Sequence, residues 1–350
     1  MKLHTLFIAL ISVLFFSCSP QKKTQEEDTK NWIWVHANKD RTVEEWTRLL
    51  KQYNSIGVKA ILLGANTEVL ERVIPLAHQQ NIEVHAWMWT LNKNGDSIAA
   101  QHPDWFSVNR LGESCYDKKP YVGYYSWVCP SIPQVQEHIL NKVQSLLDIE
   151  GVDGIHLDYV RYCDAILPKG LWAKYDIIQD KVYPQWDYGY NPSNIKLFKA
   201  LYGYSPLDLD DPNTDENWVE FRLSTVTDLV NKIADLVHSQ NKQLSAAVFP
   251  SPRLSRKMVY QPWDQWNLDA ALPMIYHNFY EEDIAWIGET TADGVAIVDG
   301  KFPIYTGLFV HDLKEEDLKT ATELAVKSGA NGWCLFDANS FEKFHQSKID

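Results

Sequence analysis

Short apolar runs alternate with longer amphipathic stretches along the chain from residue 31 onward. The short runs have the length and residue types of strands, and the stretches between them have the apolar spacing of helices that bury one face. The predicted strands cover residues 32–36, 58–64, 82–89, 152–158, 243–249, 268–276, 303–309 and 332–337. The predicted helices cover residues 43–55, 68–80, 133–147, 218–239, 282–290 and 315–327, with only a helical stub at 263–266.

Eight strands separated by helices predict a (β/α)8 barrel of the TIM type, in which parallel strands form the wall and helices cover it. Several strands follow a glycine that ends the preceding helix, as at Gly57, Gly151 and Gly329. No shift in composition marks a second boundary. The sequence therefore predicts a single α/β domain over residues 31–350.

Two connections are much longer than the few residues usual between a strand and the next helix. Residues 90–131 follow the third strand, and residues 159–217 follow the fourth. Both loops leave the carboxyl ends of strands, which is the face where barrel enzymes build their active sites. The second loop is rich in tryptophan and tyrosine, so it is a self-packed cap, a wall that binds sugar rings, or both.

The composition is that of a globular protein with an unusual content of aromatic residues. The 350 residues are 45% hydrophobic and 23% charged, which are ordinary values for a folded domain. The chain has 14 Trp, 17 Tyr and 13 Phe, more rings than a core requires, and proteins use such rings to hold flat or amphipathic ligands. The formal net charge of −13 repels phosphate backbones, so nucleic acid is not an expected partner.

The first residues have the features of an export signal. An apolar run too short for a membrane span ends in Phe15-Phe16-Ser17-Cys18. This end resembles the bacterial lipoprotein signal, in which a lipid-modified cysteine becomes the new N-terminus; an ordinary secretory signal is the alternative. The resemblance implies a signal peptide over residues 1–17, lipidation of Cys18 and a flexible tether over residues 18–30. It also implies an exported bacterial protein that its lipid anchors to the outer membrane.

Four further cysteines follow the tether, at Cys115, Cys129, Cys163 and Cys334. In an oxidising compartment Cys115 and Cys129 are candidates for a disulfide, whereas Cys334 lies in an apolar run and is predicted to be a buried thiol. No CxxC pair is present, so no structural zinc site is expected, and the chain is predicted to need no metal or cofactor. One alternative is a metal site inside the barrel that is built from three histidines, namely His36, His85 and His156.

The fourth predicted strand carries the strongest candidate for chemistry. The stretch reads Gly151-Val152-Asp153-Gly154-Ile155-His156-Leu157-Asp158-Tyr159-Val160-Arg161-Tyr162. Because side chains alternate along a strand, Gly154, His156 and Asp158 share the inward face, with Asp158 at the top. A buried carboxylate is costly unless it is paired or catalytic, so Asp158 is predicted to be catalytic. A structural ion pair between Asp158 and Arg161 is the alternative.

The same alternation brings other polar and aromatic residues to the carboxyl ends of strands. On the eighth strand, Trp333, Leu335 and Asp337 are predicted to share the inward face. Because barrels carry out their chemistry at these ends, a functional pocket is expected there. The candidates for this pocket are His36, Trp87, Trp89, Tyr276, His277, Trp333 and Asp337.

A family resemblance rests on several motifs. The segment Gly154-Ile155-His156-Leu157-Asp158-Tyr159-Val160-Arg161-Tyr162 resembles the signature of the glycosyl-hydrolase-like family 10 barrels. Further matching motifs within residues 31–340 are His85-Ala86-Trp87, His102-Pro103-Asp104-Trp105, Cys129-Pro130-Ser131, Asp187-Tyr188-Gly189-Tyr190-Asn191-Pro192 and Pro273-Met274-Ile275-Tyr276. The resemblance implies a (β/α)8 barrel that is exported from bacteria and acts on glycans.

The family 18 chitinases offer a second comparison. They carry D-G-x-D-x-D-x-E on the fourth strand, where the final Glu is the general acid. At the matching positions this chain has His156 in place of the middle Asp and Val160 in place of the Glu. Valine cannot donate a proton, so chitinase chemistry by that residue is excluded.

Glycoside hydrolysis usually requires two carboxyl groups. Asp158 is predicted to be the first, as nucleophile or base, and Asp337 is preferred as the second because a strand end holds a side chain more rigidly than a loop does. The other candidates for the second group are Asp164, Glu281, Glu282 and Asp312. Contacts with the sugar are predicted for His36, Trp87, Trp89, His156, Arg161, Tyr276, His277 and Trp333.

The expected function is that of a membrane-anchored glycosidase acting on a polysaccharide or oligosaccharide. Two alternatives remain open at this point. One is a barrel that has lost catalysis and binds glycans as a surface lipoprotein, and the other is a carbohydrate lyase.

Overall fold

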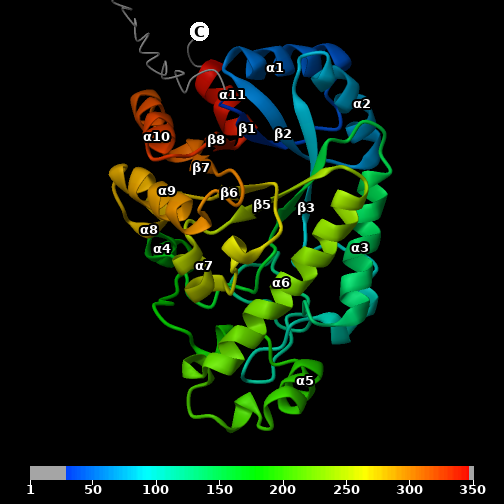
Figure 1. Ribbon diagram of the computed structural model, residues 1–350, viewed down its shortest axis with the longest axis vertical. Coiled ribbons are helices and arrows are strands. Elements are labelled where there is room, and N and C mark those ends of the chain that lie inside the picture. The colour runs from blue at the N-terminus through cyan, green and yellow to red at the C-terminus, as the bar shows by residue number, and fades with distance from the viewer. Residues whose placement is uncertain (1–28, 347–350) are drawn as a thin grey trace, which may run out of the picture.

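The computed structural model describes residues 29–346 and contains the predicted barrel (Figure 1). The predicted signal peptide and Cys18 lie outside the described residues. One parallel sheet has the strand order β6-β5-β4-β3-β2-β1-β8-β7. Isolated bridges between Ala271 and Ile304 and between Met274 and Gly307 join β6 to β7, so the barrel is nearly closed. The strands are β1 (Asn31–His36), β2 (Val58–Gly64), β3 (Glu83–Trp89), β4 (Gly154–Asp158), β5 (Gln243–Val248), β6 (Ala270–Pro273), β7 (Tyr305–Phe309) and β8 (Gly332–Phe336).

Helices surround this sheet and extend beyond it along the second long loop (Figure 1). They are α1 (Val43–Ser55), α2 (Thr67–His78), α3 (Pro133–Leu147), α4 (Trp172–Tyr175), α5 (Pro192–Tyr202), α6 (Glu216–Ser239), α7 (Pro252–Val259), α8 (His277–Tyr280), α9 (Ala285–Val298), α10 (Glu315–Lys327) and α11 (Ala338–Gln346). The predicted bounds of α1, α3 and α10 are confirmed. At α1 a capping box between Thr42 and Glu45 fixes the first residue of the helix.

The sixth strand and the helix after it differ from the prediction. The strand ends at Pro273 instead of continuing to Tyr276, because the chain turns there into the short helix α8. Glu281 then adopts a left-handed conformation, with φ of 58°, which ends α8. The following helix α9 therefore begins at Ala285 and not at 282.

Tryptophan side chains fill much of the barrel interior. Trp32 and Trp34 of β1 are fully buried there, and the ring of Trp32 lies 4.6 Å from that of His85. The interior cluster consists of Trp32, Trp34, Ala60, Leu62, Trp87, Ala247, Ala270, Leu272, Tyr305 and Cys334. Small residues on the facing strands leave room for the large rings, as dense packing requires. Part of the aromatic surplus therefore serves packing and not ligand binding.

The predicted orientation of β8 is wrong. Cys334 and Phe336 pack inside the barrel, whereas Trp333 and Leu335 pack against the helices outside it. The sequence of β8 is apolar throughout, so no polar alternation marks its inward face. Pairing with β1 sets the orientation instead, because the small Cys334 lies beside the large Trp32.

A buried ion pair ties the second long loop to the rest of the molecule. Arg222 of α6 donates to Asp187 Oδ1 at 2.6 Å, and both side chains are fully buried. The Tyr190 hydroxyl donates to the other oxygen of Asp187, and Asn191 makes two hydrogen bonds to the backbone of the first long loop. The motif over residues 187–192 is therefore a clamp between the two loops.

Rings on and around α5 form a separate core beyond the barrel, made of Tyr190, Phe198, Trp218 and Phe221. This part of the aromatic loop is the self-packed cap that the sequence left open.

The disulfide considered from sequence is not formed. Cys115 and Cys129 are buried free thiols, as is Cys334. The sulfur of Cys129 lies 3.4 Å from Ser131 Oγ, and burial raises the pKa of Cys115 to about 12. Between residues 29 and 346, no helix has the length and apolar character needed to cross a membrane.

Candidate active site

Asp158 is the last residue of β4 and lies in the mouth of the barrel. Its Oδ1 accepts a hydrogen bond from the backbone N–H of Tyr159 at 2.7 Å, and its Oδ2 accepts one from Trp87 Nε1 at 3.1 Å. Burial raises the pKa of Asp158 to about 6, and the two hydrogen bonds only partly oppose this effect. The carboxyl is therefore held in a fixed orientation and carries a proton under mildly acidic conditions.

Tyr159 shapes the site through its backbone. It adopts a left-handed conformation, with φ of 51°, directly after the strand. A non-glycine residue in this region is uncommon and marks a constrained turn. The turn directs the Tyr159 N–H at Asp158, and the Tyr159 ring lies 4.9 Å from that of Trp89.

Asp337 lies at the mouth of the barrel through a different route from the one predicted. It follows β8 and caps α11, since its Oδ1 accepts hydrogen bonds from Ser340 N at 3.0 Å and Ser340 Oγ at 2.8 Å. Its charge acts on His36 of β1, where burial lowers the pKa and Asp337 opposes that effect. The ring of His36 lies 4.5 Å from that of Trp87, which binds Asp158. Asp158, Trp87, His36 and Asp337 therefore form one continuous cluster.

Tyr276 also belongs to this cluster. Its side chain is buried, and its hydroxyl has no hydrogen-bond partner among the residues that the structure describes. Burial raises the pKa of Tyr276 well above its usual range, and the negative charges of Asp158 and Asp337 add to the effect. Both carboxylates thus lie within electrostatic reach of a hydroxyl that is left without a partner. A buried polar group in this state is a candidate for binding a ligand.

Partly exposed aromatic rings border the cluster on two sides. Beside Tyr159 they are Trp89 and Tyr124, whose centroids lie 5.9 Å apart. On the other side they are Phe279, Phe309 and Phe336, which pack on one another and on Tyr276. Sugar rings have apolar faces that pack against such surfaces. Sequence alternation identifies Trp89, whereas nothing in the sequence marks Tyr124 or Phe279.

His156 does not reach the site, contrary to the prediction. It is fully buried beneath the mouth of the barrel, where its Nε2 accepts a hydrogen bond from Trp34 Nε1 at 3.0 Å. Nε2 therefore carries no proton, and Nδ1 donates to Ser245 Oγ at 2.9 Å. Burial lowers the pKa of His156 well below its usual range. His156 is a neutral core residue because both of its nitrogens are used inside the barrel.

Arg161 also does not reach the site, where it was predicted to contact the sugar. Its guanidinium is buried 4.7 Å from the ring of Trp127 and pairs with Asp164 at 3.1 Å. The alternative of a structural ion pair between Asp158 and Arg161 is therefore wrong, because Arg161 has another carboxylate partner. Asp164 in turn accepts a hydrogen bond from Tyr121, which removes it as a candidate for the second catalytic group.

Of the remaining predicted residues, Trp333 lies outside the barrel, whereas His277 and His36 lie near its mouth. Trp333 faces the helices outside the barrel and lines a hollow beside α10, so its predicted contact with the sugar is wrong. His277 opens α8 next to Tyr276 and is partly exposed. His36 lies at the end of β1 with part of its side chain exposed and part packed on Trp87.

The predicted histidines do not converge. His85 packs on Trp32, His156 bonds to Trp34, and His36 lies at the rim beside Trp87. The described part of the chain contains no group of three or more His, Cys, Asp or Glu residues that could hold a metal ion.

The barrel is similar to those of several solved glycosidases. A β-galactosidase from the psychrophilic Marinomonas ef1 superposes with a TM-score of 0.61 at 11% identity, covering 88% of this chain and 54% of that one. The catalytic domain of a β-amylase from Paenibacillus polymyxa gives 0.57 at 9% identity, with 92% and 99% covered. An endo-β-1,4-mannanase from Thermotoga petrophila gives 0.53 at 10% identity, with 89% and 68% covered. Identities this low show the shared fold alone, and this chain spans about half the length of the β-galactosidase.

Family assignment comes from the sequence. No curated protein matches the chain. Residues 51–297, which are more than half of the chain and include β4 with Asp158, match the glycosyl hydrolase-like 10 family. Asp337 lies beyond the matched residues. With its (β/α)8 barrel and with Asp158 at the mouth of that barrel, the chain belongs to the glycosyl hydrolase-like 10 family.

Proposed function

We propose that this protein hydrolyses glycosidic bonds in a polysaccharide or oligosaccharide and that Asp158 is the proton donor. The observation that carries this proposal is the state of Asp158, a carboxyl at the end of β4 whose pKa is raised to about 6 by burial. A glycosidase requires an acid of this kind to protonate the leaving oxygen. Because Trp87 and Tyr159 donate to the two oxygens, the acidic proton occupies a remaining lone pair.

The proposed role of Asp158 differs from the nucleophile or base that the strand pattern suggested. The other role falls to a second carboxylate, and Asp337 is the candidate that the cluster supports. It lies in electrostatic reach of both His36 and Tyr276, which surround the same mouth. One of its oxygens is engaged in capping α11, so the other oxygen would serve as base or nucleophile. Trp89 and the rings beside it would bind the sugar faces.

The activity is expected to depend on pH through Asp158. The protonated form is the active one in this proposal, so kcat/KM should fall about tenfold for each pH unit above the pKa of about 6. A profile of kcat/KM between pH 5 and pH 8 on a cleaved glycan would measure this. A profile that stays flat above pH 6 would show that Asp158 does not donate the proton.

Replacing Tyr276 with Phe should lower the activity without lowering the stability. The change removes a buried hydroxyl without a partner, so the free energy of unfolding should stay constant or rise by about 1 kcal/mol. If the hydroxyl binds the substrate, kcat/KM should fall about tenfold or more. Tyr162→Phe is the matched control, since the Tyr162 hydroxyl is bonded to Thr225 and this variant should lose stability and keep activity. Unchanged kcat/KM in Tyr276→Phe would remove Tyr276 from the site.

The function itself is tested by incubating the purified protein with a panel of polysaccharides and oligosaccharides. The proposal expects new reducing ends with at least one glycan. The absence of cleavage across the panel, at high protein concentration and long incubation, would contradict it.

A glycan-binding protein without hydrolytic activity is the second candidate. The use of an Asp337 oxygen as a helix cap favours it, because that carboxylate has a structural role of its own. Calorimetry that shows tight binding of a glycan that is never cleaved would select this candidate over hydrolysis.

We also propose that the mature chain begins at a lipid-modified Cys18 and is held on the outer membrane. The resemblance of residues 15–18 to a lipoprotein signal supports this. The mass of the N-terminal peptide isolated from cells tests it, since an acylated Cys18 is expected and an unmodified N-terminus contradicts the proposal.

A further inference from the structure

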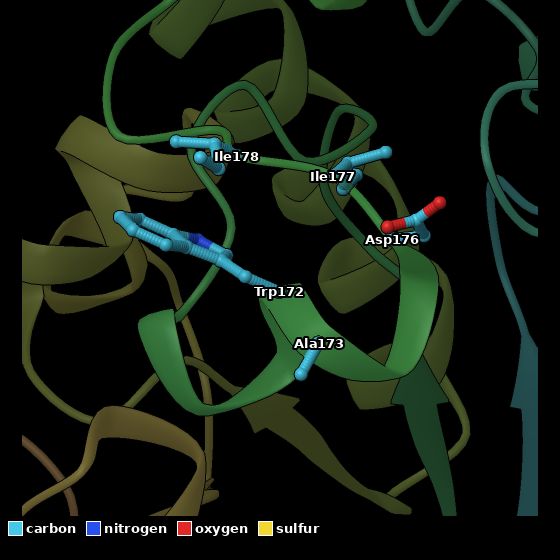
Figure 2. Close-up of a pocket in the computed structure, with 5 residues that line it drawn as sticks. All are labelled: Trp172, Ala173, Asp176, Ile177 and Ile178. Atoms are coloured by element: carbon cyan, nitrogen blue, oxygen red, sulfur yellow. The ribbon is translucent and has the colours of Figure 1, made fainter.

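A hollow on the second long loop lies outside the active-site cluster (Figure 2). It is an open depression with a volume of about 460 Å³. Its lining residues are Trp172, Ala173, Asp176, Ile177 and Ile178. Figure 2 shows the Trp172 side chain extending from α4 toward Ile178.

The indole of Trp172 is fixed in place. Its Nε1 donates to the backbone oxygen of Leu167 at 2.9 Å, so the polar edge of the ring is satisfied within the protein. Trp172 is only half-buried, and Ile178 is 65% exposed. The hollow thus presents both apolar and polar surface to water, and the exposed Asp176 side chain is one of its lining residues. An apolar ring beside a hydrogen-bond acceptor matches a sugar, which has apolar faces and hydroxyl donors.

Aromatic side chains connect this hollow to Asp158. Tyr175 lies on α4 with Trp172, and its ring packs 5.2 Å from that of Tyr121. Successive ring contacts then run through Tyr121–Tyr125, Tyr125–Tyr124, Tyr124–Trp89 and Trp89–Tyr159. Tyr159 directly follows Asp158. Packed rings, some of them buried, therefore link α4 to the surface proposed to bind the substrate.

A second contact holds the hollow beside the mouth of the barrel. The turn Lys169–Leu171 precedes α4 and packs on α8, which Figure 1 shows beside α4. The fit is close, because a Cβ added at Gly170 would lie 2.3 Å from the Asn278 backbone oxygen. Lys169 also pairs with Glu281 at 2.5 Å. Since α8 begins directly after Tyr276, the hollow is fixed relative to the active site.

We infer that the Trp172 hollow is a secondary sugar-binding site that holds a part of the glycan chain remote from the bond being cleaved. This inference rests on the proposed function and adds to it, because it requires a substrate with several sugar units. The ligand is a sugar unit without negative charge, since Asp176 in the lining of the hollow repels a uronate.

The test compares affinities for long and short substrates in the Asp158→Asn background, where the glycan is bound and not cleaved. The probes are the polysaccharide that the wild-type protein cleaves in the panel and the trisaccharide of the same linkage. Trp172→Ala should weaken binding of the polysaccharide about 3- to 10-fold relative to the trisaccharide, because stacking on one aromatic ring contributes on this scale. Trp172→Phe keeps a ring and should restore most of the polysaccharide affinity.

Tyr202→Ala is the matched control, since it removes a ring that is 38% exposed on α5, away from the hollow. It should leave both affinities unchanged. Equal affinities of Trp172→Ala and its parent for the polysaccharide would overturn the inference while leaving the proposed function intact. Failure of the wild-type protein to cleave any glycan would instead refute the proposed function.

Discussion

Replacing Asp158 with Asn is expected to lower kcat on a cleaved glycan by about 10²- to 10⁴-fold, because a positioned proton donor contributes on that scale. Asn preserves the size and shape of the side chain and removes the acidic proton, but its single amide oxygen can accept only one of the two hydrogen bonds that Trp87 and Tyr159 donate to Asp158. The measurement is the initial rate of release of reducing ends at saturating substrate. A variant that retains more than a tenth of the activity would show that Asp158 is not the acid.

The stability of Asp158→Asn relative to the wild-type protein is also expected to change with pH. Burial raises the pKa of Asp158 in the folded protein to about 6, above its ordinary value of 3.8. A raised carboxyl pKa destabilises the folded state once the group ionises, so the wild-type protein loses this stability as pH rises from about 4 to 6. Asp158→Asn cannot ionise, and its stability relative to wild type should rise by up to about 3 kcal/mol over that range. Urea denaturation at pH 4.5 and pH 7 measures the difference; a difference independent of pH would contradict the burial of this charge.

Replacing Asp187 with Ala is expected to destabilise the protein by about 3–5 kcal/mol, because it leaves Arg222 charged and buried without its partner. The side chains of Asp187 and Arg222 are both fully buried, and the Tyr190 hydroxyl also loses its acceptor. The loss should appear in urea denaturation as a lower midpoint. Both long loops meet at this clamp, so activity should decline with the fraction of folded protein.

An exposed ion pair provides the control for this prediction. Arg253 and Asp293 pair at 2.7 Å on the surface, and the Arg253 side chain is 74% exposed. Asp293→Ala should cost less than about 1 kcal/mol, since water screens such a pair. Equal losses in the two variants would show that the Asp187 clamp is no more than a surface contact.

The fold followed from the sequence where apolar spacing and helix-ending glycines agree. Those signals placed the eight strands and predicted α1, α3 and α10 with their observed bounds. They missed α4, α5, α7, α8 and α11. Most of these helices are short, and α5 belongs to a loop whose structure depends on tertiary contacts such as the Asp187 clamp. They also missed the orientation of β8, because a strand with two apolar faces has no alternation to interpret.

The site was predicted only in part, because the pattern along a strand does not show which contacts a side chain makes in the folded protein. Strand alternation brought His36, Trp87 and Asp158 to one mouth. It placed Asp158 above His156 on the strand but also predicted a sugar contact for His156, which is used in the core. Arg161 shows a further limit, since the choice between Asp158 and Asp164 as its partner depends on the path of the loop.

The aromatic surplus has two origins that composition alone does not separate. Trp32 and Trp34 fill the barrel, and the rings around α5 form a core of their own. Trp89, Tyr159 and Trp172 remain partly exposed along the proposed path of the substrate.

The mass of the products formed from a cleaved glycan in heavy-oxygen water tests the central claim most directly. Hydrolysis adds one water molecule across each cleaved bond. We therefore expect saturated fragments with a single heavy oxygen at the new end, formed by the wild-type protein and not by Asp158→Asn. Unsaturated fragments without the label would indicate a lyase. Those fragments, or labelled products formed equally by both proteins, would contradict hydrolysis driven by Asp158.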